Sequence, residues 1–376
     1  MTQPKIDIVA LGQDLDALEL ELRESAGEAD KIHLFRMIRW GQILFWLGYC
    51  TSGLMVQPFS ILCISLANFS RWGMISHHIL HRGYDRIASM PPTYTSKFYA
   101  KGWRRYWHWF DWIHPQAWNY EHNILHHYKL GEDQDPDQPE QNLHSLRNSK
   151  MPLFLRYCWI FMLAMVWKPL YYAPNTHLEW FRSKQKKAKE PILESSLLSP
   201  FVWLPWHTPG QYLWFTSWLP YLLRTFVFLP LPFLYFGPRV FWIACINIAL
   251  SELVTNIHSF VAIVPNHAGE DVYRFRSSTK DRYSFYLRQI VGSVNYRCGG
   301  NGNDFLHGWL NYQIEHHLWP DMTMLQYQKA QPRVKAICAQ HSVPYVQESV
   351  FIRLFKLLRI MVGSASMNVW TETKEE

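Results

Sequence analysis

Histidine is concentrated in three short groups of this sequence. The chain contains 18 His in 376 residues. The groups read HHILH at 77–81, HNILHH at 122–127 and QIEHH at 313–317. An isolated His is most often a hydrogen-bonded core residue, and we interpret the ungrouped ones in that way. Neutral imidazole is the commonest metal ligand in proteins, so three compact groups beside apolar regions predict a metal site.

The spacing within the groups is that of one face of a helix. Residues four apart lie one turn apart on the same face, which pairs His77 with His81 and His122 with His126. Gln313 lies one turn before the last two His and shares their face. Adjacent residues point about 100° apart on a helix, so an adjacent His pair can ligate two different metal ions. Pairs of this kind occupy 126–127 and 316–317.

The number of grouped histidines indicates two metal ions. A catalytic zinc site uses three protein ligands and a structural one four, and the grouped histidines exceed both. Soluble di-iron carboxylate proteins use Glu-x-x-His pairs, a pattern absent from this sequence. A nitrogen-rich site with open positions suits oxygen-activating iron, although imidazole also binds Zn, Cu and Ni. Iron is therefore expected from ligand type together with membrane context.

Two apolar regions must position these groups. No charged residue occurs from Trp40 to Ser70, a run longer than the ~20 residues of one membrane span. Gly53 and Pro58 interrupt it, which predicts a hairpin of helices over 34–53 and 56–75, with the second helix continuing into the aqueous phase. One long tilted helix is the alternative. In the second region, the turn signal Gly237-Pro238 predicts another hairpin over 212–236 and 239–260.

The rest of the chain is polar or interfacial in composition. The Trp- and Arg-rich segment 94–118 suits a helix in the membrane interface, and 153–173 is expected to dip into the interface without crossing. Basic residues around both place them, and the histidine groups, on the cytoplasmic side. The sequence thus predicts an all-α, multi-pass integral membrane protein of about four transmembrane helices in two hairpins. Its parts are a polar N-terminal tail (1–31), a membrane domain (32–355) and a C-terminal tail (356–376).

The composition also indicates which partners to expect. The formal net charge is +7, and the chain has 19 Trp and 20 Tyr. A basic excess fits nucleic acid, an anionic membrane or an acidic protein. The basic residues here adjoin apolar, Trp-rich stretches, and no nucleic-acid-binding motif occurs, so we expect a membrane partner and no nucleic acid. No G-x-G-x-x-G and no Cys cluster occurs, so we expect no nicotinamide, flavin or iron–sulfur site.

At these residues the sequence resembles the membrane fatty-acid desaturases. Their three histidine boxes follow the pattern H-x(3–4)-H, H-x(2–3)-H-H and [HQ]-x-x-H-H, and this chain has all three in that order. The segment NDFLHGWLNYQIEHHLWPDM (303–322) is similar to the third box of the front-end branch, in which Gln replaces the first His. The resemblance covers about residues 40–355.

Carried over by position, the resemblance implies ligands from all three boxes and one later His. His258 is the alternative to His267, and Gln313 would bind the metal or support a ligand. His78 stands where the family commonly has Asp, so either an acid is replaced or His78 itself ligates. The implied ligands are His77, His81, His122, His126, His127, His267, His316 and His317.

Other residues near the boxes are expected to support the site. Ligating imidazoles usually pass their second N–H to a carboxylate or carbonyl. His307 and Asn303 are expected to line the site rather than to bind metal. Acids near the boxes are candidate partners of the imidazoles, or else solvated loop residues: Asp85, Asp133, Asp135, Asp137 and Asp304.

The resemblance implies a four-helix membrane domain under a cytosolic helical cap that holds two Fe ions. Its members use O2 to insert a double bond into a lipid acyl chain, with electrons from cytochrome b5 or ferredoxin and a reductase. Many front-end members carry a fused cytochrome b5 domain with a His-Pro-Gly-Gly motif. Here only HTPG (207–210) and HPQA (114–117) occur, so a separate electron donor is expected.

Other functions remain open from the sequence. The same centre would serve a hydroxylase or ketolase of fatty acid, sphingolipid or carotenoid. A zinc-dependent membrane hydrolase, or a seven-helix receptor with a zinc site, fits less well because the apolar regions suffice for about four spans. A non-catalytic membrane scaffold would leave the histidine groups unexplained.

Overall fold

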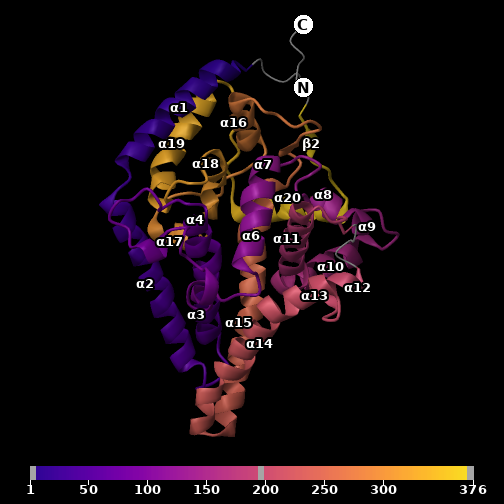
Figure 1. Cartoon of the computed structure of the whole chain (residues 1–376). Helices are drawn as coiled ribbons and strands as arrows, with labels where there is room; N and C mark the ends of the chain where they lie inside the picture. Colours follow the sequence, from indigo (N-terminus) through magenta and orange to yellow (C-terminus); the bar gives the residue numbers. More distant parts are fainter. Residues whose placement is uncertain (1–5, 194–198, 371–376) are drawn as a thin grey trace.

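The protein is mostly helical, and its long helices project from a cap of shorter ones. The computed structural model describes residues 6–193 and 199–370. Figure 1 shows the cap at the top, with α1, α16, α18 and α19, and the long helices below it. The first five residues of the predicted N-terminal tail and the last six of the predicted C-terminal tail lie outside the described residues.

The polar N-terminal segment forms helix α1 (Ile8–Ser25), which belongs to the cap. Asp7 caps it, because its carboxylate accepts hydrogen bonds from the backbone N–H groups of Val9 and Ala10. Its buried leucines recur at helical spacing and face α16 (Arg282–Val291) and α19 (Met324–Gln340). Arg23 adds a salt bridge to Asp321 at 2.6 Å. The N-terminal segment is therefore packed onto the cap.

The first predicted hairpin is present as a pair of packed helices. Helix α2 (Glu28–Thr51) ends before Gly53, and α3 (Pro58–Phe69) begins with its proline. A Cβ on Gly48 would lie 2.9 Å from a side-chain atom of Cys63, so the glycine lets the two helices approach closely. The chain continues from α3 as the π-helical segment η1 (Ser70–Ser76) and then α4 (His77–Leu80), which carries the first histidine box.

The second hairpin turns at Gly237, as predicted. Gly237 has φ 105°, a conformation that glycine adopts without strain. Before it, helical segments follow one another from Pro200 to Phe236, and after it α15 (Pro238–Ile263) runs back to the short η9 (Val264–His267). The segments before the turn are α12 (Pro200–Trp203), α13 (Thr208–Leu213), η6 (Trp214–Trp218), α14 (Leu219–Leu223), η7 (Arg224–Phe228) and η8 (Leu231–Phe236).

Among the described residues, two to three helical stretches are long and apolar enough to cross a membrane. Two are Pro200–Phe236 and Pro238–His267. A third arises if α10 (Leu153–Met165) and the stretch Lys168–Ala188, bent by 87°, count as one broken span. Neither helix of the first hairpin is among these stretches.

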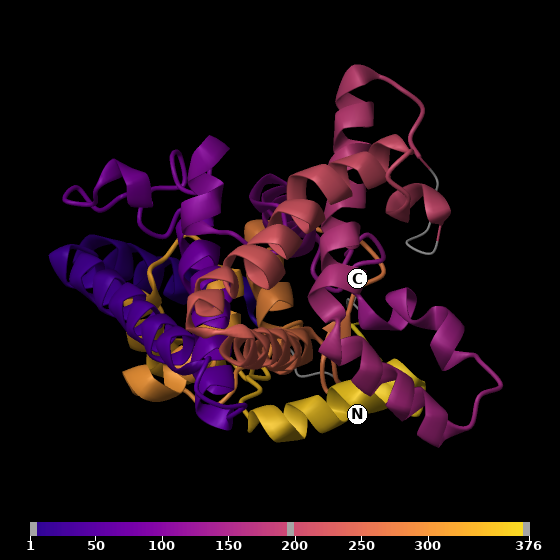
Figure 2. The ribbon, with the colours of Figure 1, turned by 90° about the horizontal axis from the view of Figure 1, so that it is seen from below.

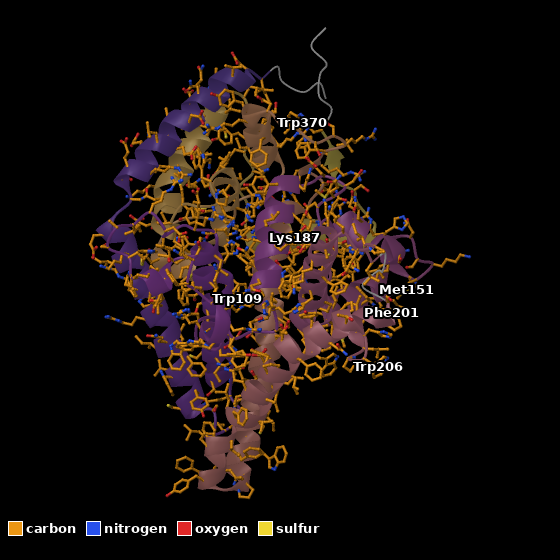
Figure 3. The ribbon with its side chains drawn as sticks, in the orientation of Figure 1. Trp109, Met151, Lys187, Phe201, Trp206 and Trp370 are labelled. Carbon is orange, nitrogen blue, oxygen red and sulfur yellow. The ribbon has the colours of Figure 1, made fainter. Side chains whose placement is uncertain are left out.

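Segment 94–118 is not the single interfacial helix predicted from its composition. It contains short helices separated by turns: η2 (Pro92–Tyr94), η3 (Gly102–Arg104), α5 (Arg105–His108) and the start of α6 (Pro115–Tyr120). Ala100 and Gly102 have positive φ, which breaks a helix, and Pro115 begins a new one. The break turns Trp109, labelled in Figure 3, into the interior, where it packs on Trp118.

The C-terminal part closes the cap. Helix α20 (Val350–Val362) lies beside α10, as Figure 2 shows from below. Strands β1 (Tyr273–Arg274) and β2 (Asn368–Val369) pair in parallel, with Tyr273 opposite Asn368. The other helices are η4 (Glu121–His126), α7 (His127–Lys129), α8 (Pro139–Asn142), α9 (His144–Arg147), η5 (Lys168–Tyr172), α11 (Ala173–Ala188), α17 (Asn301–Leu306), η10 (Leu310–Tyr312) and α18 (Gln313–Leu318).

Candidate metal centre

The three histidine boxes and His267 converge beneath the cap. The first box follows the π-helical η1, and most of the second lies within the π-helical η4. Such wider turns are frequent at functional sites, since they re-aim side chains along a helix. The third box is helix α18, which is buried along its whole length. His267 ends η9, directly after the last long helix.

The converging histidines form two groups, within each of which the ligand atoms all lie within 4.8 Å of one another. The first group takes residues from all three boxes. The second combines the second and third boxes with the later His. The first group is His77, His81, His122 and His316, and the second is His126, His267 and His317.

Consecutive histidines of the third box serve different groups. His316 belongs to the first group and His317 to the second, as expected for adjacent positions on one helix. His127 lies between the groups, because its ring centroid is 4.5 Å from that of His81 and 4.2 Å from that of His317. All eight predicted ligands are therefore gathered in one buried cluster of two halves.

Polar groups outside the cluster hold several imidazoles through Nδ1. This arrangement directs Nε2 inward and fixes the ring orientation. The partners include one carboxylate, one side-chain amide, one phenol and one backbone carbonyl. The contacts are His126–Asp135 Oδ1 at 2.9 Å, His317–Gln289 Oε1 at 2.9 Å, His316–Tyr327 Oη at 3.2 Å and His267–Gly292 O at 3.3 Å.

Burial keeps most of the cluster in the metal-binding form. In the first group, burial and then the neighbouring imidazoles hold the pKa of each ring well below the usual range. This group is His77, His81, His122 and His316. These rings are neutral at neutral pH, with a lone pair free for a metal. For His126, burial lowers the pKa, but the charge and hydrogen bond of Asp135 outweigh it and raise the pKa.

Several inward ring nitrogens lie close to one another. Nε2 of His77 lies 3.0 Å from Nε2 of His316, and that of His127 lies 3.3 Å from that of His122. Within the described residues, the buried Nε2 atoms of His81 and His317 have no hydrogen-bond partner. Two ring nitrogens this close either share a proton in a hydrogen bond or bind one cation between them, and the unpartnered Nε2 atoms favour the cation, so the cluster fits bound metal ions.

An apolar cavity of about 70 Å³ adjoins the cluster. One side of it is formed by His77, His122 and His126. The cavity is the size of a few methylene groups and brings an apolar ligand directly beside the imidazoles. Apolar residues that form the opposite walls include Trp72, Leu143, Leu163, Phe260, Ile263 and Met361.

Comparison with known proteins identifies the family. Residues 52–349 match the model of the family described as "Fatty acid desaturase". The chain belongs to the fatty acid desaturase family. The two halves of the histidine cluster are consistent with the di-metal site of such a desaturase.

Individual desaturases are distant from this chain. It is 24% identical over 366 residues to the acyl-lipid (9-3)-desaturase of Physcomitrium patens, covering 91% of this chain but 60% of that protein. It is 24% identical over 371 residues to the NADPH-dependent stearoyl-CoA 9-desaturase of Mycobacterium tuberculosis, covering 94% and 79%. Fatty acid desaturase 3 of Bos taurus is 41% identical over 69 residues, which cover 18% and 15% of the two chains. No solved structure gives a significant match.

The remaining candidates lie at different distances from the cluster. Gln313 borders it, because its Nε2 lies 2.9 Å from Nε2 of His267. His78 is buried beside the first group, and its Nδ1–H donates a hydrogen bond to the carbonyl of Met74 at 2.6 Å. His258 lies outside both groups and contacts the carbonyl of Leu306 through Nε2 at 2.7 Å.

The candidates that precede the third box organise the loop rather than the cluster. Asp304 is fully buried and accepts hydrogen bonds from Asn311 and from the hydroxyl of Tyr312. Asn303 donates to the carbonyl of Arg297, and the carbonyl of Asn303 contacts Nδ1 of His307. Of the more distant acids, Asp85 binds Ser96 and Asp133 binds Gln141.

Some residues of the site carried little signal in the sequence. Glu121 is fully buried, and burial followed by the charges of Asp137 and Asp135 raises its pKa well above the usual range. Asp137, one of the predicted acids, also borders the site: its carboxylate lies within 4.8 Å of the ligand atoms of His122 and His126, and burial raises its pKa to about 6. Gln289 lies 28 residues before His317 and Tyr327 lies 11 residues after His316, and neither separation is the one-turn spacing that reveals neighbours on a helix.

Proposed function

We propose that this protein is an O2-dependent desaturase of lipid acyl chains that uses a di-iron centre. The single observation that carries the proposal is the buried cluster of two histidine groups beside an apolar cavity. Membership of the fatty acid desaturase family supports the same reaction. The acyl-lipid and stearoyl-CoA activities named for the relatives support a lipid-linked or CoA-linked acyl substrate.

The proposed ligands divide between the two groups, with His127 placed to serve either. Converging lone pairs and unpartnered Nε2 atoms support binding of a cation in each group. Nitrogen-rich ligation with open positions supports iron over a hard cation such as Mg²⁺. Gln313 and Asp137 border the cluster and are proposed to support it rather than to bind metal. The proposed ligands are His77, His81, His122, His126, His127, His267, His316 and His317.

The proposed reaction converts a –CH2–CH2– unit and O2 into a –CH=CH– unit and two waters. Two hydrogens come from the chain, and an external donor supplies two electrons and two protons. When bound, the iron pair supplies the oxidation of the unactivated C–H bonds by O2. The chain's own residues position the acyl group and exclude water: Trp72, Leu163 and Phe260 contact the methylenes in the cavity, and α18 keeps its histidines out of solvent.

We also propose four spans in two hairpins, with the histidine boxes on the cytoplasmic side. The first hairpin, 34–53 and 56–75, would span the membrane together with 212–236 and 239–260, leaving 94–118 and 153–173 in the interface. Segment 94–118 contains exposed aromatic residues, including Trp103 and Trp107, which support an interfacial position for it. Phe201 and Trp206, which precede the proposed span 212–236 and are labelled in Figure 3, are also exposed. The two electrons are proposed to come from a separate cytochrome b5 or ferredoxin with its reductase.

Lipid mass spectrometry of a host that expresses the protein tests the function. The control is the double variant His316→Ala/His317→Ala, which removes one ligand from each group. We expect an acyl species two mass units lighter in the wild type and not in the variant. A gain of sixteen mass units would replace desaturation by hydroxylation. If iron-loaded protein with electron donor and acyl substrate yields neither product, the proposal is wrong.

A further inference from the structure

A second cavity, of about 410 Å³, lies on the other side of the helix that bears the first box. Trp72 of η1 lines the cavity beside the histidines, whereas the preceding residue, Arg71, lines this second cavity. Its walls come from α2, from the end of α3 and η1, from segment 94–108 and from η7. The second cavity is therefore separate from the place proposed for the reacting acyl chain.

Two arginines face this cavity without an acidic partner. Arg71 and Arg224 both line it, and none of its lining residues is Asp or Glu. Within the part of the chain that is described, neither guanidinium makes a hydrogen bond or an ion pair. Each guanidinium lies near an aromatic ring: that of Arg71 is 5.9 Å from the centroid of Phe45, and that of Arg224 is 5.4 Å from the centroid of Phe110.

The nearest buried acids are already engaged elsewhere. The Asp111 carboxylate is paired with Lys168 at 2.7 Å. Glu252 accepts hydrogen bonds from the hydroxyl of Tyr221 at 2.7 Å and from the indole of Trp112 at 3.1 Å. The ten N–H donors of two guanidinium groups thus remain available to a ligand, and two cations sharing one cavity favour an anion between them.

The other walls of the cavity indicate what kind of anion would fit. Apolar side chains such as Ile38, Phe45 and Leu229 line it together with the arginines. Trp46 and Trp107 line it as well and are 59% and 79% exposed. Exposed Trp beside partly buried apolar residues suits contact with lipid. Arginine binds phosphate with a fork of parallel hydrogen bonds.

We infer that this second cavity binds an anionic membrane phospholipid. The phosphate is held between Arg71 and Arg224, and an acyl chain of the lipid lies against the apolar wall. The bound lipid is a structural lipid and not the reacting acyl chain, because Trp72 and η1 separate the two cavities. The inference does not depend on the proposed reaction, since lipid binding is measured without turnover.

Binding of phosphatidylglycerol to the purified, delipidated full-length protein in detergent tests the inference. Diacylglycerol with the same acyl chains lacks the phosphate and serves as the ligand control. The variant is Arg71→Gln/Arg224→Gln. Its match is Arg36→Gln/Arg39→Gln, which removes the same charge from exposed positions of the neighbouring helix. Native mass spectrometry counts the bound lipid.

We expect phosphatidylglycerol, but not diacylglycerol, to bind the wild type and the Arg36/Arg39 variant. The Arg71/Arg224 variant should bind about tenfold more weakly or worse, because charge-assisted hydrogen bonds are lost. Equal losses in both variants, or equal binding of the two lipids, would overturn the inference. Displacement of phosphatidylglycerol by coenzyme A would also overturn it and assign the cavity to the phosphates of a soluble acyl carrier.

A measurement on the wild type alone covers the case in which the variant does not fold. Phenylglyoxal modifies accessible arginines, and peptide mass spectrometry locates the modification. Phosphatidylglycerol should protect Arg71 and Arg224 at least about fivefold more than Arg36 and Arg39, whereas diacylglycerol should protect none of them. Unselective protection would contradict the inference.

Discussion

Nδ1 of His126 lies 2.9 Å from Oδ1 of Asp135, and both side chains are buried. The same carboxylate accepts hydrogen bonds from the backbone N–H groups of Gly131 and Asp137. A loop of about ten residues after the second box is thus folded around one acid, and that acid sets the orientation of one imidazole. A histidine held in this way binds metal more tightly than a free one, because its ring is already placed.

Asp135→Asn should therefore weaken metal binding by about 10–100-fold without removing a ligand. Chelator titration of the purified protein, followed by iron analysis, measures this loss. Asp133→Asn is the matched control, since Asp133 is an exposed acid of the same loop whose carboxylate accepts a hydrogen bond from Gln141 and from no imidazole among the described residues. Equal chelator sensitivity of the two variants would show that Asp135 does not support the site.

The two histidine groups predict the metal stoichiometry of single variants. His81→Ala removes a residue of the first group only, and His267→Ala one of the second only. Because each group lies around its own centre, we expect either variant to retain about one metal ion per chain where the wild type holds about two. Inductively coupled plasma mass spectrometry gives the count, and His341→Ala is the control, since His341 binds Asp14 away from the cluster. Full metal content in both variants would refute the assignment.

The buried ion pair of Lys168 and Asp111 should be a major determinant of stability. The two groups lie 2.7 Å apart, with Lys168 fully buried and also 5.1 Å from the ring centroid of Trp72. Lys168→Met leaves a buried carboxylate without its partner, which costs about 3–5 kcal/mol. Thermal unfolding in detergent should show a large drop in midpoint that Asp111→Asn partly restores in the double variant.

The control for this prediction is on the next helix. Lys187→Met removes an exposed lysine of α11, labelled in Figure 3, and should change the midpoint little because exposed charges contribute little. A double variant less stable than Lys168→Met alone would show that the carboxylate is not the source of the loss.

His114 should make stability depend on pH. Burial, and then the charge of Arg105, lower the pKa of His114 to about 2, against about 6.5 in the unfolded chain. Protonation therefore favours unfolding, and the stability contributed by His114 is complete above about pH 6.5 and is lost as pH falls below that value. At pH 5.5, one unit below the unfolded pKa, the loss relative to high pH is about 1.4 kcal/mol.

His114→Asn should reduce this dependence by one proton. Asn retains an acceptor for the backbone N–H of Gln116, which His114 now caps through Nδ1 at 3.2 Å. Unfolding midpoints at pH 7.5 and pH 5.5 should differ less in the variant than in the wild type, where the other buried histidines contribute the rest. An unchanged difference would mean that His114 is already protonated, or is not buried, in the folded protein.

Much of the site could be predicted from the sequence because the spacing of its histidines is local. The four-residue spacing of His77 and His81 and the adjacency of His316 and His317 follow from helix geometry, and both are observed. The helix breaks at Pro58 and Gly237 were predicted for a similar reason. The breaks within segment 94–118 were not predicted, because its composition is typical of a membrane interface and says nothing of the positive φ at Ala100.

Long-range partners were beyond the reach of sequence spacing. Gln289 holds His317 from a helix nearly thirty residues earlier, at 2.9 Å, and Tyr327 holds His316 from α19. Neither is distinguishable in sequence from an ordinary residue of an amphipathic helix. Asp304 is the opposite case, because its position near a box predicted a contact with an imidazole. Its carboxylate instead accepts hydrogen bonds from Tyr312 and Asn311.

The order in which the chain leaves the ribosome limits when the metal can enter. Neither histidine group is complete before His316 and His317 have been made, because each needs one residue of that box. Met361 of α20 forms part of the cavity wall, and the carbonyls at the end of that helix accept hydrogen bonds from Arg147 and Arg156. We therefore expect metal loading to be a late step of biogenesis, one that follows synthesis of the third box and of the long helices before it.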